Sequence, residues 1–426
     1  MPLKNKKIIF LSVLAGLISS QASLGHSATL QDLSDTEMSE VTGQALMSMS
    51  FISPDDIANN MRGKGIGFYK LGMEAELDIN ANINKLQLGC GGINGPGACD
   101  IEIDNLSLSG NFDTSEGRVG SSAKLTNPFF EFAIKDPDSA SKREMVGVRL
   151  SAEKTLGLLT IGTENSNEPN GIKSLSGYLK LKETSGVAYT NPRNLQPSNV
   201  GGQSISGVIR GIGRYPFTTT NYNLALTSAK ANILVGETEI SGRRITHADL
   251  NGVATIDPID FSGTINTRIN VFPVNLVSIP ISARGSIAGV KANLEISQNL
   301  GFIHKINLNN PLSLSLQSED IHWGGAAVAA QRGWWLAFED PIDIGQLNPA
   351  NRIDITDNVL SQLIQPLSDY LTSNPINCGT TILSCLPGVD IPQVNLNGQT
   401  VQFPLRDLKL ATQNFAPNCY GGLKFC

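Results

Sequence analysis

The sequence predicts an all-β protein, mainly antiparallel, in an extended or sandwich-like arrangement with one C-terminal helix and a short N-terminal helix. Strand-sized apolar segments recur about every ten to fifteen residues, separated by turns rich in Gly, Asn, Pro and Ser. Many segments alternate in polarity with a period of two, which places one set of side chains on each face of an extended chain. Sustained helical spacing is confined to residues 357–371.

The N-terminus has the pattern of a signal peptide. Lys4, Lys6 and Lys7 precede a short apolar run from Ile8 to Ile18, and small residues follow it. Cleavage fits after Ala22 or after Ala28, so residues 1–28 are assigned to the signal. We therefore expect export through Sec to the cell surface, the extracellular space or the periplasm.

Residues 29–44 predict a short helix. Ser34 and Glu37 form a capping box, and Gly43 provides a stop. The string from Leu33 to Gln44 resembles the start of secreted surface proteins of Gram-negative bacteria described as pilus or filament assembly proteins of the Fil type. That resemblance implies a role connected with pili or filaments.

A first β-rich unit is expected over residues 45–200, beginning with a strand at Met47, Met49 and Phe51. Its central feature is a strand over residues 75–83, a clipped loop between Cys90 and Cys99, and a second strand with a bulge at Asp104–Asn105. Two further strands are expected at residues 146–150 and 158–161.

A second β-rich unit is expected over residues 201–322, after a polar stretch at residues 191–202 that reads as a long loop or a seam. Its strands include residues 222–226, 261–271 and one continuous segment over 303–316. The C-terminal region, residues 323–426, should contain the helix at 357–371, two Cys loops and a last pair of strands near residues 401–410.

The six cysteines fall into three closely spaced pairs, which in an exported chain predicts three local disulfides. Zinc-type spacing is absent from the sequence, which disfavours a metal site. Each bridge would close a short loop and stabilise the fold by about 2–3 kcal/mol. The expected pairs are Cys90–Cys99, Cys378–Cys385 and Cys419–Cys426.

Composition and motifs disfavour nucleic-acid binding, catalysis and metal binding. The net charge of −6, which falls to about −9 without the signal, disfavours nucleic acid as a partner. Nucleophile elbows and the common metal-binding motifs are absent from the sequence, so we expect no catalytic residues, cofactor or metal. Asp100, Glu102 and Asp104 share one strand face and would suit Ca²⁺, although a solvated acidic face is the favoured interpretation.

The tryptophans are concentrated in one segment of the C-terminal region. An exposed aromatic cluster would mark a contact surface for sugar, lipid or protein. Packing between the helix and a sheet explains the same residues equally simply and is favoured. The cluster comprises Trp323, Trp334, Trp335 and Phe338.

These observations favour a non-enzymatic, exported surface protein, associated with filaments or adhesion, that acts by protein–protein contact through exposed strand edges. Its partners would be other surface or filament proteins and not nucleic acid. The chain itself is expected to have no transmembrane segment. One alternative is a binding module that holds lipid or another apolar ligand along a curved sheet. A second alternative is a polysaccharide-acting enzyme, which needs two carboxylates about 5–10 Å apart in a cleft.

Overall fold

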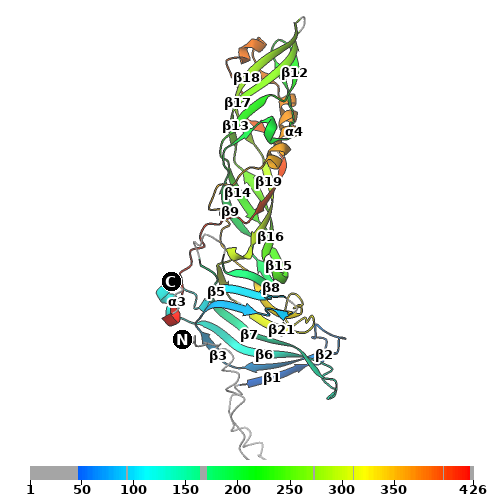
Figure 1. Ribbon diagram of the computed structural model, residues 1–426, viewed down its shortest axis with the longest axis vertical. Helices are drawn as coiled ribbons and strands as arrows, with labels where there is room; N and C mark the ends of the chain where they lie inside the picture. Colours follow the sequence, from blue (N-terminus) through cyan, green and yellow to red (C-terminus); the bar gives the residue numbers. More distant parts are fainter. Residues whose placement is uncertain are drawn as a thin grey trace, which may run out of the picture. The chain divides into compact units, whose positions relative to one another are not determined.

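The computed structural model describes residues 47–92, 95–163, 170–271, 274–309, 311–396 and 398–422. The expected signal peptide and N-terminal helix lie outside these residues. From residue 46 onward the chain forms one compact unit. The described part is mostly strand, in four mainly antiparallel sheets, which confirms the all-β prediction (Figure 1).

The first sheet, called sheet A here, has 12 strands. β3 (Glu76–Ile79), β15 (Thr238–Ile245) and β20 (Lys305–Leu308) branch from its main path, on β6, β8 and β7 respectively. β7 also pairs with β5, so the hydrogen-bonded path β7–β21–β22–β8–β5 returns to its start. In order, the main path is β1 (Met47–Ile52), β2 (Ile66–Met73), β6 (Ala123–Lys135), β7 (Glu144–Thr160), β21 (Leu312–Gln317), β22 (Gly333–Ile342), β8 (Ile172–Leu181), β5 (Ile101–Ser109) and β4 (Ala81–Leu88).

Three smaller sheets share one continuous core with β5 and β8 of sheet A and with the helix α4 (Asp357–Ser373). Sheet B orders β26 (Thr400–Arg406), β19 (Lys291–Asn299), β16 (His247–Ile256), β14 (Lys230–Val235) and β9 (Thr184–Tyr189). Sheet D orders β10 (Arg193–Leu195), β13 (Tyr222–Leu226), β17 (Ile259–Val271), β18 (Val274–Ala288) and β24 (Val389–Asp390), with β25 (Val394–Asn395) also on β18. Sheet E orders β12 (Arg214–Thr219), β11 (Ile205–Arg210) and β23 (Ile376–Asn377).

The expected boundaries at residues 200 and 322 do not separate these sheets. Sheet A takes β15, β20 and β21 from the second predicted unit and β22 from the C-terminal region. The three regions are therefore joined by backbone hydrogen bonds within a single sheet.

The strand predicted over residues 75–83 is interrupted at Asn80. Its Nδ2 atom donates to the carbonyl oxygens of Arg118 (2.8 Å) and Ser121 (2.5 Å), so the side chain takes part in a turn between β3 and β4. The bulge expected at Asp104–Asn105 is not seen in the pairing of β5 with β4, which keeps one register from Ile83↔Leu106 to Lys85↔Asp104. The backbone is irregular there only in that Asn105 has a left-handed φ of 51°.

Other strand boundaries differ because partners far along the chain decide them. The two strands expected at residues 146–150 and 158–161 are one strand, β7, which pairs with β6 along most of its length. The single strand expected over 303–316 is instead β20 and β21, which pair with different parts of β7. The expected final strand pair is only β26, which pairs in parallel with β19.

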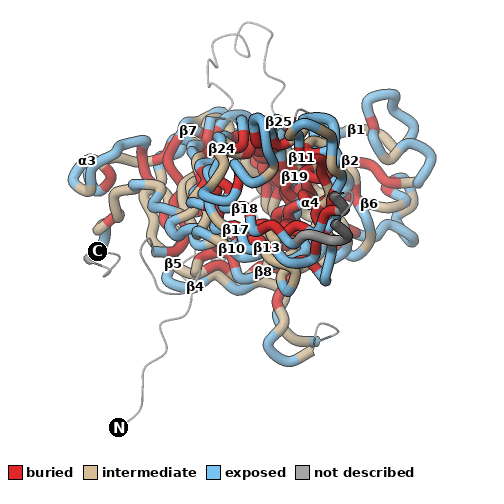
Figure 2. Tube along the Cα trace, turned by 90° about the horizontal axis from the view of Figure 1, so that it is seen from above, coloured by how far each residue is buried: buried red, intermediate tan, exposed pale blue. Residues whose placement is uncertain are grey.

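The C-terminal helix has the predicted position. Thr356 caps its start, with its hydroxyl accepting from the Val359 N–H, and an apolar stripe from Val359 to Leu371 is buried. The buried side of α4 packs against β11, while residues such as Asp357, Gln365 and Asp369 stay exposed (Figure 2). The short helix α3 (Ser115–Val119) was not expected, because five residues are too few to show a helical period.

Two of the expected disulfides are confirmed. Cys90 bonds Cys99 at the ends of the glycine-rich loop, and Cys378 bonds Cys385 after α4. Cys419 is also disulfide-bonded, while its expected partner Cys426 lies outside the described residues. The described bridges each close a short turn.

The C-terminal strap, defined here as residues 376–420, connects the sheets. It adds β23 to β11, β24 and β25 to β18, and β26 to β19, all in parallel. Its final residues reach sheet A, where the Asn82 Nδ2 donates to the Asn418 carbonyl oxygen (2.8 Å). The strap thereby occupies backbone groups on three sheets.

Arg118 of α3 anchors the end of this strap. The side chain is fully buried, and its guanidinium donates to the Ala416 carbonyl oxygen (2.6 Å). It also donates to the hydroxyls of Ser107, Ser109 and Thr160. Burial lowers the pKa of Arg118 to about 10, so the group stays charged at neutral pH.

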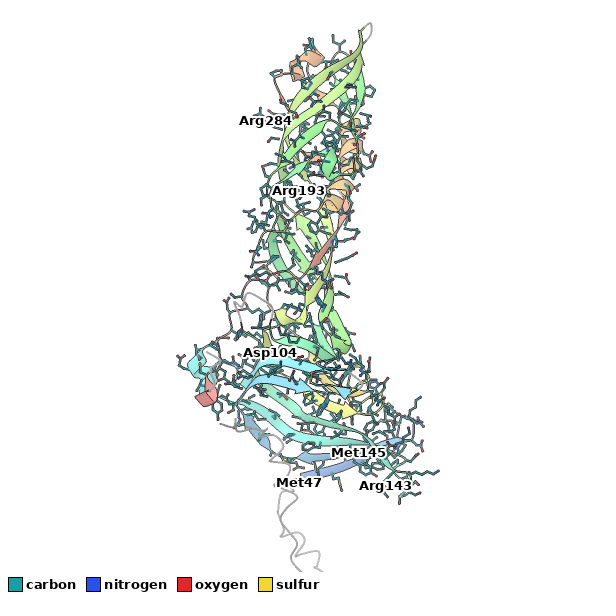
Figure 3. The ribbon with its side chains drawn as sticks, viewed as in Figure 1. Met47, Asp104, Arg143, Met145, Arg193 and Arg284 are labelled. Carbon is teal, nitrogen blue, oxygen red and sulfur yellow. A yellow bond between two sulfur atoms is a disulfide. The ribbon has the colours of Figure 1, made fainter. Side chains whose placement is uncertain are left out.

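We expect Arg118→Ala to lower the free energy of unfolding by about 2–4 kcal/mol, because several charge-assisted hydrogen bonds are lost and a cavity is left. Urea denaturation of the oxidised protein measures the change. Arg143→Ala, at an exposed arginine (Figure 3), should shift the free energy by less than about 0.5 kcal/mol. Equal midpoints for the two variants would contradict the anchoring role.

Candidate contact surface

One face of sheet A is apolar across six neighbouring strands and is called the open face here. Cross-strand register fixes its members, because paired residues point to the same side of a sheet. The register aligns β1 with β2, β2 with β6, β6 with β7, β7 with β21, and β21 with β22. The open face comprises Met47, Met49, Phe51, Tyr69, Leu71, Met73, Phe130, Phe132, Val148, Leu150, Leu314, Leu316, Trp334 and Leu336.

Much of the open face is accessible to solvent. The exposed fraction is 81% for Met49, 56% for Met47 and 43% for Phe51, and most of the other members are half-buried. Phe51 stacks on Tyr69 with ring centroids 4.3 Å apart. Met47, labelled in Figure 3, lies on β1 at the border of the sheet. A contiguous apolar surface of this kind is typical of an interaction site.

The same face is covered where it continues onto β8 and β5. Leu336 on β22 is level with Gly177 on β8, and Leu175 on β8 is level with Ile101 on β5. Leu175 and Ile101 are fully buried in the main core. One sheet face therefore changes from core to surface along its width.

The border strand β1 offers a further means of contact. Among the described residues it pairs only with β2, which leaves the backbone groups on its other side available. Its first five residues alternate Met or Phe with Ser, Ile52 ends it, and the strand includes no charged residue and no proline. Charged side chains and proline are the residues that usually protect a strand edge from further pairing.

The opposite face of sheet A carries buried polar groups under the segment 318–332. Arg149 on β7 forms a buried ion pair with Glu131 on β6, and its guanidinium also donates to the Gly324 carbonyl oxygen (3.0 Å). The guanidinium carbon lies 5.4 Å from the ring centroid of Trp323. This polar layer fixes the segment that covers it.

The structure places the tryptophan cluster mainly inside the molecule. Trp323 and Trp335 are each 2% exposed and Phe338 is 5% exposed, so these three do not form the expected contact surface. Trp335 projects to the covered face, because it alternates with Trp334 along β22. Trp334 is half-buried on the open face and packs against the main core. The packing interpretation describes this cluster.

The acidic triplet on β5 does not act as one group. Asp100 is buried and forms ion pairs with Arg244 (3.3 Å) and Arg243 (3.8 Å), and it accepts the Trp334 N–H (3.2 Å). Glu102 forms an ion pair with Lys85 at 3.0 Å. At least two of the three carboxylates are therefore committed to cations of the chain itself.

A partly buried carboxyl on β22 has a shifted pKa. Burial raises the pKa of Glu339 on β22, although the Ala327 N–H bond (2.9 Å) and the nearby Arg149 and His322 oppose the shift. The pKa of a carboxyl rises when its charged form loses hydration. Glu339 therefore couples the covering segment to pH.

Sequence reasoning missed the open face as a surface. The alternation of Met47, Met49 and Phe51 was visible, and so was that of Leu314 and Leu316. The residues between them are serines, which suit either a buried or an exposed face. Only charged residues at the alternate positions, in place of these serines, would have indicated which side of the strand faces water.

Comparison with known proteins gives no relative: no family model, no curated protein and no solved structure matches the chain. Within the described residues, none of the helices combines the length and the apolar character needed to cross a membrane.

Glu339→Gln should remove the contribution of this carboxyl to the pH dependence of the free energy of unfolding. In the wild type the raised pKa lies above the unfolded value near 4.5, so the stability present below that value is lost as the pH rises through the folded pKa. The difference in free energy of unfolding, variant minus wild type, should therefore increase with pH over this window. Urea denaturation at a series of pH values measures it, with Glu319→Gln on the surface as control. A difference that does not change with pH would refute the coupling.

Proposed function

We propose that this chain is an exported, non-enzymatic surface protein that binds other proteins through the open face and the free edge of β1. Its place would be in a filament or in an adhesive structure at the cell surface. The observation that carries the proposal is the exposure of Met47, Met49 and Phe51 beside a strand edge that pairs with no described strand.

Two kinds of attraction act at this site. A partner strand laid along β1 would gain backbone hydrogen bonds, while its side chains would cover the apolar surface. Burying a Met or Phe side chain contributes about 1.5–3 kcal/mol, so a few such residues would support binding. Unbranched methionines adapt to partners of different shape.

Export is part of the proposal. The N-terminal pattern motivates it, and the disulfides are consistent with an oxidising compartment. The resemblance at Leu33–Gln44 supports a connection with pili or filaments.

A second candidate function uses the same open face differently. Its members carry no charged group over six strands, which also suits a lipid or another extended apolar ligand. Titration with a fluorescent fatty acid tests this use, with Phe130→Asp as the variant that should weaken binding. Binding that survives Phe130→Asp unchanged would exclude the open face as the ligand site.

Met49→Lys should abolish partner binding while changing the free energy of unfolding by less than about 0.5 kcal/mol, because the residue is largely exposed. A strain that lacks the chain would be complemented with wild type, Met49→Lys or Ile57→Lys. Attachment and surface fibres are then measured by imaging, after cell fractionation.

The control Ile57→Lys places the same charge at another exposed apolar residue, outside the strands. It should behave as wild type, whereas Met49→Lys should behave as the deletion. The proposal fails if the deletion leaves attachment and fibres unchanged and the protein is found only in soluble form in the periplasm.

A further inference from the structure

A cavity of about 270 Å³ lies between the segment that precedes α4 and the end of β26. One backbone hydrogen bond joins the two walls: the Ala350 N–H donates to the Lys409 carbonyl oxygen (2.7 Å). A second ties the first wall to β9, because the Ile353 N–H donates to the Tyr189 carbonyl oxygen (2.8 Å). Both segments are thus held in place by the fold, so the cavity is formed before any ligand arrives.

The rim of the cavity is positively charged. Arg352, Arg406 and Lys409 line it, against the single carboxylate of Asp354. Asp354 already accepts a hydrogen bond from the Asn191 Nδ2 (2.7 Å). Arg406 also forms an ion pair with Asp407, which lies just outside the lining (Nε–Oδ2 3.4 Å). Arg352 and Lys409 still leave the rim with an excess of positive charge, in a chain whose net charge is −6.

Arg352 is the cation with a fixed position. Its Nη1 donates to the Thr190 carbonyl oxygen (3.1 Å) and to the Ser228 hydroxyl, and its guanidinium lies 5.9 Å from the ring centroid of Tyr189. A guanidinium held on one side in this way keeps further donors for an anion. Lys409 forms no ion pair with any described residue and supplies a second cationic donor.

The remaining lining is largely apolar. Phe403 and Leu405 come from β26, and Ile353 and Leu408 complete this part of the wall. Phe403 belongs to the main core, and the other three pack against it. An apolar floor beneath a cationic rim distinguishes this cavity from a surface cluster of basic side chains.

We propose that this cavity binds a small anionic amphiphile, with its carboxylate or phosphate head on Arg352, Arg406 and Lys409 and its apolar body on Phe403 and its neighbours. The site is separate from the open face and does not rest on its role. A volume slightly below that of most ligand pockets fits a short apolar body better than a full lipid.

Isothermal titration calorimetry of the full oxidised chain tests the proposal with four probes: octanoate, octyl phosphate, octan-1-ol and inorganic phosphate. At least one of the two amphiphiles should bind, and the stronger one identifies the head group. Octanol and inorganic phosphate should each bind at least about tenfold more weakly, because each lacks half of the required chemistry.

The double variant Arg406→Gln/Lys409→Gln should weaken binding of the preferred amphiphile by about tenfold and reduce its salt dependence. Arg284→Gln, at an exposed arginine on β18 (Figure 3), should leave the affinity unchanged. Circular dichroism checks that all variants fold. Equal affinity in the double variant, equal affinity for inorganic phosphate, or no binding of either amphiphile at millimolar concentration would each overturn the proposal.

Discussion

Backbone hydrogen bonding at sheet edges is the constraint on which the rest of the structure depends. A strand edge presents a row of donors and acceptors that must find partners in protein or in water. The C-terminal strap meets much of this requirement with short parallel strands on β11, β18 and β19. It ends against Arg118, whose buried guanidinium joins the strap to β5 and β7. The strap thus makes several sheets depend on one another.

In sheet A, by contrast, the edge at β1 has no further described partner strand, and the two faces differ in how far they are covered. Its covered face carries the ion pair of Arg149 and Glu131, and a segment with Trp323 lies over that pair. Its open face is apolar and half-exposed. Polar groups are buried on the covered face, where they hold the covering segment in place. On the open face, Trp334 and Leu336 pack partly against the main core, while Met47 and Met49 on β1 stay largely exposed. The proposed binding role rests on this exposed apolar surface.

The open face and the cavity beside α4 would serve different kinds of partner. The open face is broad and uncharged, which suits an extended protein surface. The cavity is small, and its cations Arg352 and Lys409 lie over an apolar floor, which suits a compact anion with an apolar body. The strap contributes Phe403 and Leu405 to this floor, so the element that closes the edges also builds the cavity.

The sequence by itself determined the all-β class, the disulfide-closed turns Cys90–Cys99 and Cys378–Cys385, and the position of the C-terminal helix. Period-two alternation at Met47–Phe51 and helical spacing over 357–371 are local signals, and the short spacing of Cys90 and Cys99 is another. Only the tertiary structure decided that Trp323 and Trp335 are buried, that β7 is one strand, and that β26 pairs in parallel with β19. Alternation defines two faces without saying which one meets water, and strand partners far apart in the chain leave no local signal. For the same reason, the open face and the cavity became visible only when distant segments were brought together.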